Sequence, residues 1–433
     1  MKRKIYDDLL DWKNNNINTP LMIVGARQIG KSYIINEFCK NEFENYVYIN
    51  LFEDKNIINI YSENISSAEK FQKLELYLGK KIDLDTTIIF FDEIQESEEL
   101  ISSLKFFCES DKPFKIICAG SLLGVKINRF NNSFPVGKVR ILEMNSMSFD
   151  EFLYAYYDND MMIKEIESCY FNDKKMLEPL HNKLMELYNI YLIVGGLPEA
   201  VLNYIKNKDM LMFDRQIIDF ITNSYLKDMN KYVTDNFEST RIENIYNSIP
   251  SQLGNPSDKF QYSKVKAGAR ARDYESSINW LISSRMIFKC NNVIKCEKPL
   301  KAFLNNDVFK LYLSDVGILS YLLEISYKDL EFDEKFMYRG VIAENYVANE
   351  FLRNSLSLYY WNSGNKAEVD FILNLDDKII PVEVKSSNNN QAKSLKVYID
   401  KYDPNYSIRI SSKNFGFENN IKSVPLDAVF CIK

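Results

Sequence analysis

The chain of 433 residues contains a single histidine, His181, and only seven scattered cysteines. An odd number of scattered cysteines argues against a disulfide framework. Structural zinc is usually held entirely by Cys and His side chains, so a zinc site is not expected. One histidine without a nucleophile motif nearby also argues against Ser-His-Asp and Cys-His catalysis, and we interpret His181 as a surface or packing residue. Any chemistry of this protein is therefore expected to use carboxylates, lysines and metal ions.

Long apolar runs are also lacking, because the longest, residues 190–197, has only eight residues and includes two glycines. A membrane-spanning helix needs about 20 apolar residues. The N-terminal segment MKRKIYDDLLDWKNNN is charged and has no continuous apolar stretch, unlike a secretory signal. We therefore expect a cytoplasmic protein that does not contact a membrane.

The composition, with 46% hydrophobic and 26% charged residues, is that of a globular protein. At about 150 residues per domain, the length predicts roughly two to four domains. The formal net charge is −6, yet residues 259–301 hold ten Lys and Arg against three Asp and Glu. A basic segment in an acidic chain predicts either a surface for an anionic partner or a solvated helical face, and charge alone does not decide between them.

The first 150 residues or so alternate short apolar strands with helical stretches such as 31–40 and 96–108. This alternation predicts an α/β fold with a parallel sheet. The segment 138–144 contains Arg140 and Glu143, so it is expected to be an edge strand or a partly exposed one. The five candidate strands are 21–25, 46–51, 86–92, 114–120 and 138–144.

The remaining chain changes character near Ser148. Residues 148 to about 235 are expected to be almost entirely helical, interrupted only at the GGLP sequence of residues 195–198. Residues 236 to about 330 are expected to form short helices followed by a ribbon. The last part returns to mixed α/β structure, with a helix near 340–355 and strands at 358–361, 367–374 and 379–385.

The first strand runs into Gly25-Ala26-Arg27-Gln28-Ile29-Gly30-Lys31-Ser32, which is a P-loop motif placed between a strand and a helix. Gly25 and Gly30 permit backbone angles that a Cβ would forbid, so the loop N–H groups and the helix N-terminus can face phosphate oxygens. Lys31 is expected to reach the β- and γ-phosphates, and the Ser32 hydroxyl to bind Mg²⁺. The motif predicts an ATP site that includes all eight residues; the alternative is a chance glycine-rich turn.

Two further strands end in polar residues. Asp92 and Glu93 follow the apolar strand 86–92, where Asp92 is expected to bind Mg²⁺ and Glu93 to orient and activate the attacking water. Strand 114–120 is followed by Ser121, which would lie between the two previous sites and hold that water. The alternatives are an ordinary acidic turn for the first pair and a plain cap for Ser121.

Five segments, GARQIGKS, FFDEIQ, AGSLLG, SFDEFL and GGLP, resemble in this order the AAA-type prokaryotic ATPases that carry a C-terminal domain of unknown function. The resemblance spans essentially the whole chain. It implies an AAA+ core (1–147), a helical lid (148–235), a winged helix (236–330) and a PD-(D/E)XK restriction-endonuclease-like domain (331–433).

The GGLPEA segment is similar to a lid motif that packs against adenine in related signalling ATPases, which would place Gly196 and Pro198 near the base. A helix break at glycine followed by a helix start at proline explains it equally well.

One position departs from the resembled family, whose members usually have Gly-Arg where this chain has Gly137-Lys138. Lysine cannot form the planar, bidentate contact of arginine. If this position supplies a finger to a neighbouring subunit, hydrolysis is expected to be slow here, with Arg129 and Arg140 as substitutes.

Near the C-terminus, Glu344 lies in a predicted helix, Asp370 in the second strand of a predicted hairpin, and Glu383 and Lys385 in the next strand. Because strand side chains alternate, Glu383 and Lys385 share one face. This arrangement resembles that of the PD-(D/E)XK nucleases. The resemblance implies that Asp370 and Glu383 bind Mg²⁺, with Glu344 as a further ligand or an outer group. It also implies that Lys385 stabilises charge or lowers the pKa of the attacking water. The alternatives are a hairpin with surface charges and a nuclease fold kept as an inactive scaffold.

The basic segment KVKAGARARDYESSINWLISSRMIF resembles a winged helix-turn-helix whose second helix begins near 271–274. Lys264, Lys266, Arg270 and Arg272 would surround the turn and neutralise DNA phosphates. The alternative is that this module only joins domains.

The leading prediction is therefore an ATP-binding, Mg²⁺-dependent ATPase of the AAA type that acts as a switch or machine on DNA. Two alternatives remain: an ATP-gated, Mg²⁺-dependent DNA endonuclease, and a STAND-like signalling or defence switch with an inactive nuclease fold. AAA-type cores often assemble, so a homo-oligomer is a further candidate partner.

Overall fold

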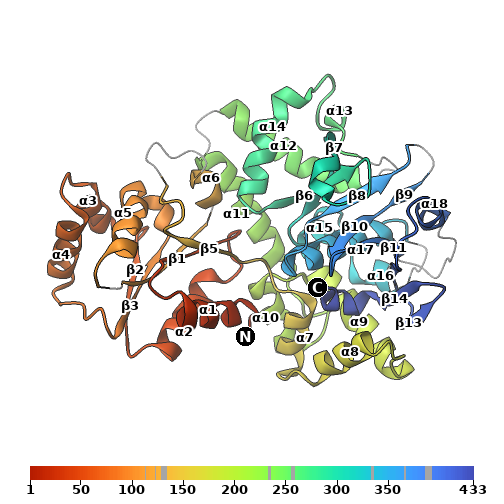
Figure 1. Ribbon diagram of the computed structural model, residues 1–433, viewed down its shortest axis with the longest axis horizontal. Coiled ribbons are helices and arrows are strands. Elements are labelled where there is room, and N and C mark those ends of the chain that lie inside the picture. Colours follow the sequence, from red (N-terminus) through yellow and green to blue (C-terminus); the bar gives the residue numbers. More distant parts are fainter. Residues whose placement is uncertain are drawn as a thin grey trace. The chain divides into compact units, whose positions relative to one another are not determined.

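The computed structural model describes residues 1–112, 114–121, 123–127, 134–232, 236–254, 259–332, 336–364, 367–385 and 393–433. The chain divides into two compact units (Figure 1). Unit 1 contains Met1–Asn145 and Ser283–Arg285, and unit 2 contains Ser146–Ile282 and Met286–Lys433. Each unit has its own sheet structure and its own apolar core.

Unit 1 is built on a five-stranded sheet in the order β2-β3-β4-β1-β5, in which every neighbouring pair is parallel. This confirms the predicted parallel α/β fold, and each predicted strand is present to within one or two residues. β3 is buried along its whole length, whereas β5 lies at the edge and alternates half-buried and exposed positions, as its charged residues predicted. The strands are β1 (Leu21–Val24), β2 (Asn45–Asn50), β3 (Thr87–Asp92), β4 (Lys115–Gly120) and β5 (Arg140–Glu143).

The helices of unit 1 include both of those expected from the sequence, α2 and α5. Helices α3 and α4 were not singled out from the sequence; α4 starts with a reciprocal capping box between Ser66 and Glu69. Helices α3, α4 and α5 pack together (Figure 1), and Phe71 of α4 meets Phe114 edge-to-face with ring centroids 4.9 Å apart. The helices are α1 (Ile5–Asn15), α2 (Lys31–Glu42), α3 (Lys55–Ser62), α4 (Ser67–Leu78), η1 (Ile94–Glu96), α5 (Glu98–Glu109) and α6 (Leu123–Ile127).

Unit 2 begins with a helical region, as predicted, and contains further helices around its sheets. The expected interruption at GGLP is present, because α9 ends at Val194 and α10 starts at Pro198. The expectation that this is the only interruption is wrong, because the helices also break at 158–160, 172–177 and 208–215. The helices are α7 (Phe149–Tyr157), α8 (Met161–Phe171), α9 (Glu178–Val194), α10 (Pro198–Asn207), α11 (Gln216–Tyr232), α12 (Asn236–Leu253), α13 (Tyr262–Val265), α14 (Ala271–Ser283), η2 (Leu300–Phe303), α15 (Val316–Leu322), α16 (Tyr327–Phe332), α17 (Arg339–Arg353), α18 (Lys393–Tyr402) and η3 (Leu426–Cys431).

Two mixed sheets complete unit 2, a four-stranded sheet in the order β7-β6-β8-β9 and a five-stranded sheet in the order β10-β11-β12-β14-β13. The predicted ribbon is the antiparallel pair β6–β7. The strands are β6 (Ile287–Val293), β7 (Leu304–Leu313), β8 (Tyr359–Asn362), β9 (Glu368–Val369), β10 (Phe371–Leu375), β11 (Lys378–Lys385), β12 (Ser407–Ser411), β13 (Gly416–Glu418) and β14 (Ile421–Pro425).

The prediction of a single strand over 367–374 is wrong. The segment divides at Asp370 into β9 and β10, which belong to different sheets. β9 completes the predicted hairpin with β8, whereas β10 pairs antiparallel with β11. At the division, the Asp370 carboxylate accepts the backbone N–H of Val384 on the neighbouring strand, with Oδ2 and N 2.6 Å apart. Asp370 therefore lies at the junction of the two sheets.

Among the helices of the described residues, none combines the length and the low charge that a bilayer-spanning helix requires.

Candidate functional site

The predicted site of unit 1 lies at the carboxyl ends of three neighbouring strands. The P-loop follows β1, Asp92 ends β3, and Ser121 follows β4, the strand between them. Because the carboxyl ends of parallel strands meet at one edge of a sheet, the sheet order brings these residues together. The contact is direct for two of them, since the Lys31 Nζ lies 3.3 Å from the Ser121 Oγ.

The P-loop has a backbone that its glycines make possible. Gly30 has φ 90°, in the left-handed region, and is the N-cap of α2. A Cβ at Gly25 would stand 2.2 Å from the carbonyl oxygen of Met144, the residue that follows β5. Because the glycine at the N-cap carries no side chain, the first N–H groups of α2 are left for another acceptor, which a phosphate supplies well. The two glycines of the motif are thus explained by the close packing at Gly25 and by the left-handed backbone at Gly30.

Lys31 is buried in this loop, with 6% of its surface exposed. Its ammonium donates to the carbonyl oxygens of Gly25, at 3.0 Å, and Ala26, at 2.6 Å. Burial lowers the pKa of Lys31 to about 8, although the negative charges of Glu93 and Asp92 oppose this shift. The ammonium is therefore poorly solvated, and an anion at the loop would stabilise its charge.

Asp92 is held by two hydrogen bonds and is 4% exposed. Its Oδ2 accepts the Tyr48 hydroxyl at 3.1 Å, and its Oδ1 accepts the Glu93 backbone N–H at 3.0 Å. Burial, followed by the negative charge of Asp92, raises the pKa of Tyr48 to about 12. The sequence analysis did not identify Tyr48. The available signal is its place two residues before Asn50, on the same face of β2, because Asn50 pairs with Asp92 of β3.

Glu93 has a left-handed backbone, with φ 53° and ψ 41°. Such a conformation is unfavourable for a non-glycine residue and persists where surrounding contacts hold it. One such contact comes from Gln95, whose Nε2 donates to Glu93 Oε2. Gln95 is 1% exposed and packs on β4, where a Cβ at Gly120 would stand 2.3 Å from its Oε1. Gln95 thus joins Glu93 to β4, the strand that Ser121 follows. The sequence indicates Gln95 only as part of the FFDEIQ motif.

Two of the three cations considered as finger residues pair with an acidic residue of unit 1. Lys138 Nζ lies 2.9 Å from Glu109 Oε1, and Arg140 Nη2 lies 3.1 Å from Asp11 Oδ2. Arg129 falls outside the described residues.

In unit 2, the four residues of the predicted C-terminal site converge with two others in a cluster that we call the acidic cluster: Glu344, Glu368, Asp370 and Glu383, with Lys310 and Lys385. Glu344 comes from α17, Asp370 from the junction of the sheets, and Glu383 and Lys385 from β11. Antiparallel pairing of Phe371 with Val382 places Asp370 beside Glu383, as predicted. Lys385 Nζ lies 2.5 Å from Glu383 Oε1.

Lys310 was missed from the sequence. This β7 residue places its Nζ 2.9 Å from Glu344 Oε1 and 2.5 Å from Glu368 Oε1, and Glu344 Oε1 also accepts the Tyr312 hydroxyl at 2.5 Å. Burial alone would raise the pKa of Glu344, but the Lys310 ammonium and the Tyr312 hydroxyl hold it below its usual value. Burial and the negative charges of Glu344 and Glu383 raise the pKa of Asp370 well above its usual value. The available signal was a lone lysine in the apolar segment 308–313.

The GGLP glycines have a packing role inside unit 2. The Gly196 N–H donates to Asp315 Oδ2 at 2.9 Å, and a Cβ at Gly196 would stand 2.0 Å from the Met147 carbonyl oxygen. Gly195 has φ 71° and approaches Gly317 so closely that a Cβ would stand 2.9 Å from its Cα. Pro198 is the first residue of α10. These contacts account for the motif by a helix break and close packing, while a contact of Gly196 and Pro198 with a base stays a prediction.

The basic residues predicted to contact DNA lie on and around α13 and α14. Lys264, Lys266, Arg270 and Arg272 are all exposed. Helix α14 begins at Ala271, as expected, and buries Ile278 and Leu281 against the core.

His181 is a packing residue that is 4% exposed, and its Nε2 lies 3.0 Å from the Ser412 carbonyl oxygen.

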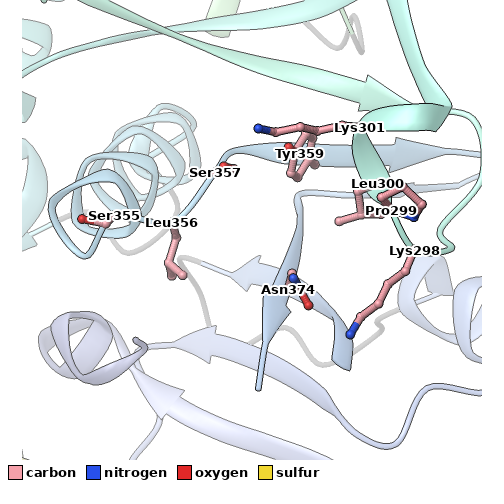
Figure 2. Close-up of a pocket in the computed structure, with 9 residues that line it drawn as sticks. All are labelled: Lys298, Pro299, Leu300, Lys301, Ser355, Leu356, Ser357, Tyr359 and Asn374. Atoms are coloured by element: carbon pink, nitrogen blue, oxygen red, sulfur yellow. The ribbon is translucent and has the colours of Figure 1, made fainter. Parts of the chain in front are cut away.

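Unit 2 also contains a pocket of about 410 Å³ that sequence reasoning did not anticipate (Figure 2). Its residues come from η2 and the residues before it, the turn after α17, β8 and β10. One of its two lysines is engaged, because Lys298 Nζ lies 2.8 Å from Asp377 Oδ1. The lining residues are Lys298, Pro299, Leu300, Lys301, Ser355, Leu356, Ser357, Tyr359 and Asn374.

Comparison with protein families assigns residues 17–153 to an AAA domain. Together with the sheet order and the P-loop, this match defines an AAA-type P-loop ATPase domain in unit 1. Residues 185–329 and 339–429 match two domains of unknown function, DUF8612 and DUF4143.

Two kinds of similar protein were found. An uncharacterized protein of Methanocaldococcus jannaschii, MJ1544, is 24% identical over 395 residues, which is 87% of this chain and 77% of that protein. Among solved structures, the Walker-type ATPase of Pyrococcus abyssi is 14% identical with a TM-score of 0.45, covering 74% of this chain and 95% of that one. The Aeropyrum pernix ORC2 protein in its ADP form is 12% identical with a TM-score of 0.35, covering 74% and 92%.

Proposed function

We propose that the protein is a nucleotide-dependent switch that binds and hydrolyses ATP at the P-loop of unit 1. The observation that carries this proposal is the convergence of Lys31, Ser121 and the Asp92–Glu93 pair at one sheet edge, next to a helix N-terminus without a side-chain cap. Lys31 would exchange its carbonyl contacts for phosphate oxygens. Glu93 would accept a proton from the attacking water, and Ser121 would hold that water.

The donor set at this edge also fits Mg²⁺, since the half-buried Ser32 hydroxyl and the Asp92 carboxylate are hard oxygen ligands. When bound, the ion would neutralise phosphate charge. The Tyr48 hydroxyl helps to fix the orientation of the Asp92 carboxylate.

Nucleotide binding is expected to stabilise unit 1, and Lys31→Ala is expected to remove this effect. At about 100 times its dissociation constant, ATP with Mg²⁺ contributes roughly 2.7 kcal/mol, which corresponds to a rise of roughly 5–11 °C in melting temperature for a domain of about 150–250 residues. Differential scanning fluorimetry of the full chain measures this rise.

The matched control is Lys40→Ala, because Lys40 is an exposed lysine in the last turn of the same helix. It should retain the full rise. If ATP does not change the melting temperature of the wild-type protein, the proposal is refuted.

We also propose DNA as a partner, supported by the four exposed cations around α13 and α14. The combined substitution Arg270→Glu with Arg272→Glu is expected to weaken DNA binding and to reduce the slope of log affinity against log salt by about 1 per lost phosphate contact. Fluorescence anisotropy with a labelled duplex at several salt concentrations measures this slope. Lys80→Glu with Lys81→Glu, an exposed basic pair in unit 1, is the control. Equal slopes for both double variants would favour a protein partner instead.

A further inference from the structure

The Lys310 side chain is enclosed by the acidic cluster, with only 11% of it exposed. Its ammonium contacts carboxylates from two different elements, Glu344 of α17 and Glu368 of β9. The Tyr360 ring lies on another side, with its centroid 5.2 Å from Nζ. A lysine is rarely buried this deeply without paired charges, so the side chain and the cluster depend on one another.

A nuclease of the resembled kind needs a divalent cation at this place, but three carboxylates here each have a protein partner already, and of the two Glu383 oxygens only Oε2 is buried without one. Glu344 Oε1 already accepts two donors, Lys310 and Tyr312. Asp370 Oδ2 accepts the Val384 N–H, and Glu383 Oε1 is paired with Lys385. Within the described part of the chain, no group of three or more Asp, Glu, His or Cys residues is arranged to hold a metal ion.

We propose that Lys310 is a built-in counter-ion that takes the place of the divalent cation, so that the acidic cluster stabilises unit 2 and does not bind metal. Two physical reasons support this. A divalent ion entering the cluster would be repelled by the resident ammonium at short range in a low-dielectric interior. An ammonium carried by β7 also has no translational freedom to lose, whereas a free ion does.

The proposal predicts that removing Lys310 converts the cluster into a cation site. The test is a titration of the full chain with Mn²⁺ in the absence of nucleotide. Mn²⁺ is an ion that carboxylates bind well. Isothermal calorimetry measures the binding, and thermal unfolding measures the change in melting temperature. The substitution Asp92→Asn is present throughout, so that any uptake reports the acidic cluster and not the P-loop. With Lys310 present, no Mn²⁺ uptake and no change in melting temperature are expected.

In Lys310→Ala, the melting temperature is expected to fall and Mn²⁺ to restore it, with one ion bound per chain. Adding Asp370→Asn to this variant should abolish the recovery. Lys289→Ala is the matched control, because Lys289 lies on the neighbouring strand β6 over the Phe309 ring and outside the cluster. This variant should gain no Mn²⁺ binding.

Uptake of Mn²⁺ by the chain that retains Lys310, lost on Asp370→Asn or Glu383→Gln, would overturn the proposal. This measurement uses chains that retain Lys310, so it tests the proposal even if Lys310→Ala does not fold. Its outcome is also independent of ATP binding at the P-loop, since nucleotide is absent.

Discussion

Glu93→Gln is expected to slow ATP hydrolysis by about 10²–10⁴-fold while ATP still binds. Glutamine keeps the shape of the side chain but cannot accept a proton from water. The backbone of Glu93 is held in the left-handed region beside Asp92, and Gln95 holds its side chain. The exchange therefore removes the base while every residue of the P-loop is retained, which separates hydrolysis from binding.

Phosphate release and the ATP-induced rise in melting temperature, measured on the same preparation, test this separation. Glu98→Gln is the control, because Glu98 is a half-buried acid in the first turn of α5, and it should hydrolyse ATP at the wild-type rate. Hydrolysis that survives in Glu93→Gln would assign the base to another residue.

Arg353→Met is expected to destabilise unit 2 by about 3–5 kcal/mol, because it leaves buried carboxylates without a compensating charge. The Arg353 side chain is 5% exposed, and its Nη1 lies 2.7 Å from Glu350 Oε1. It also donates to the Tyr191 hydroxyl at 3.0 Å and to the Ser146 Oγ at 2.6 Å. Methionine fills much of the same volume, so the effect reports lost charge and hydrogen bonds more than a cavity.

Urea unfolding followed by far-UV circular dichroism measures this loss as a fall in the free energy of unfolding. Lys175→Met is the control, since the Lys175–Glu178 pair is largely exposed, with Nζ and Oε2 3.6 Å apart; a change of about 0–1 kcal/mol is expected. If both variants unfold alike, the buried network adds nothing to stability.

The site in unit 1 could be predicted because each of its parts is local in sequence. The strands before Gly25, Asp92 and Ser121 are short and apolar, and parallel pairing brings their carboxyl ends to one edge. What local patterns did not show was which side chains support them. Tyr48 reaches Asp92 across neighbouring strands, and Gln95 reaches Glu93 from a turn that packs on Gly120.

The acidic cluster was predicted only in part, again because some of its contacts are not local in sequence. Strand alternation and a tight turn were enough to place Glu383, Lys385 and Asp370 together. They could not reveal that the strand breaks at Asp370, because the break is stabilised by a hydrogen bond to Val384 across the pairing of two strands.

The sequence by itself therefore determined the parallel sheet, the phosphate loop and the acidic residues after the strands, since these follow from side-chain period and glycine spacing. The tertiary structure alone decided which charge sits among the acids of unit 2. Lys310 is 34 residues from Glu344 and 58 from Glu368 along the chain. A charge pair of that separation leaves no trace in local periodicity, because only the tertiary fold brings Lys310 of β7 to Glu344 of α17 and Glu368 of β9.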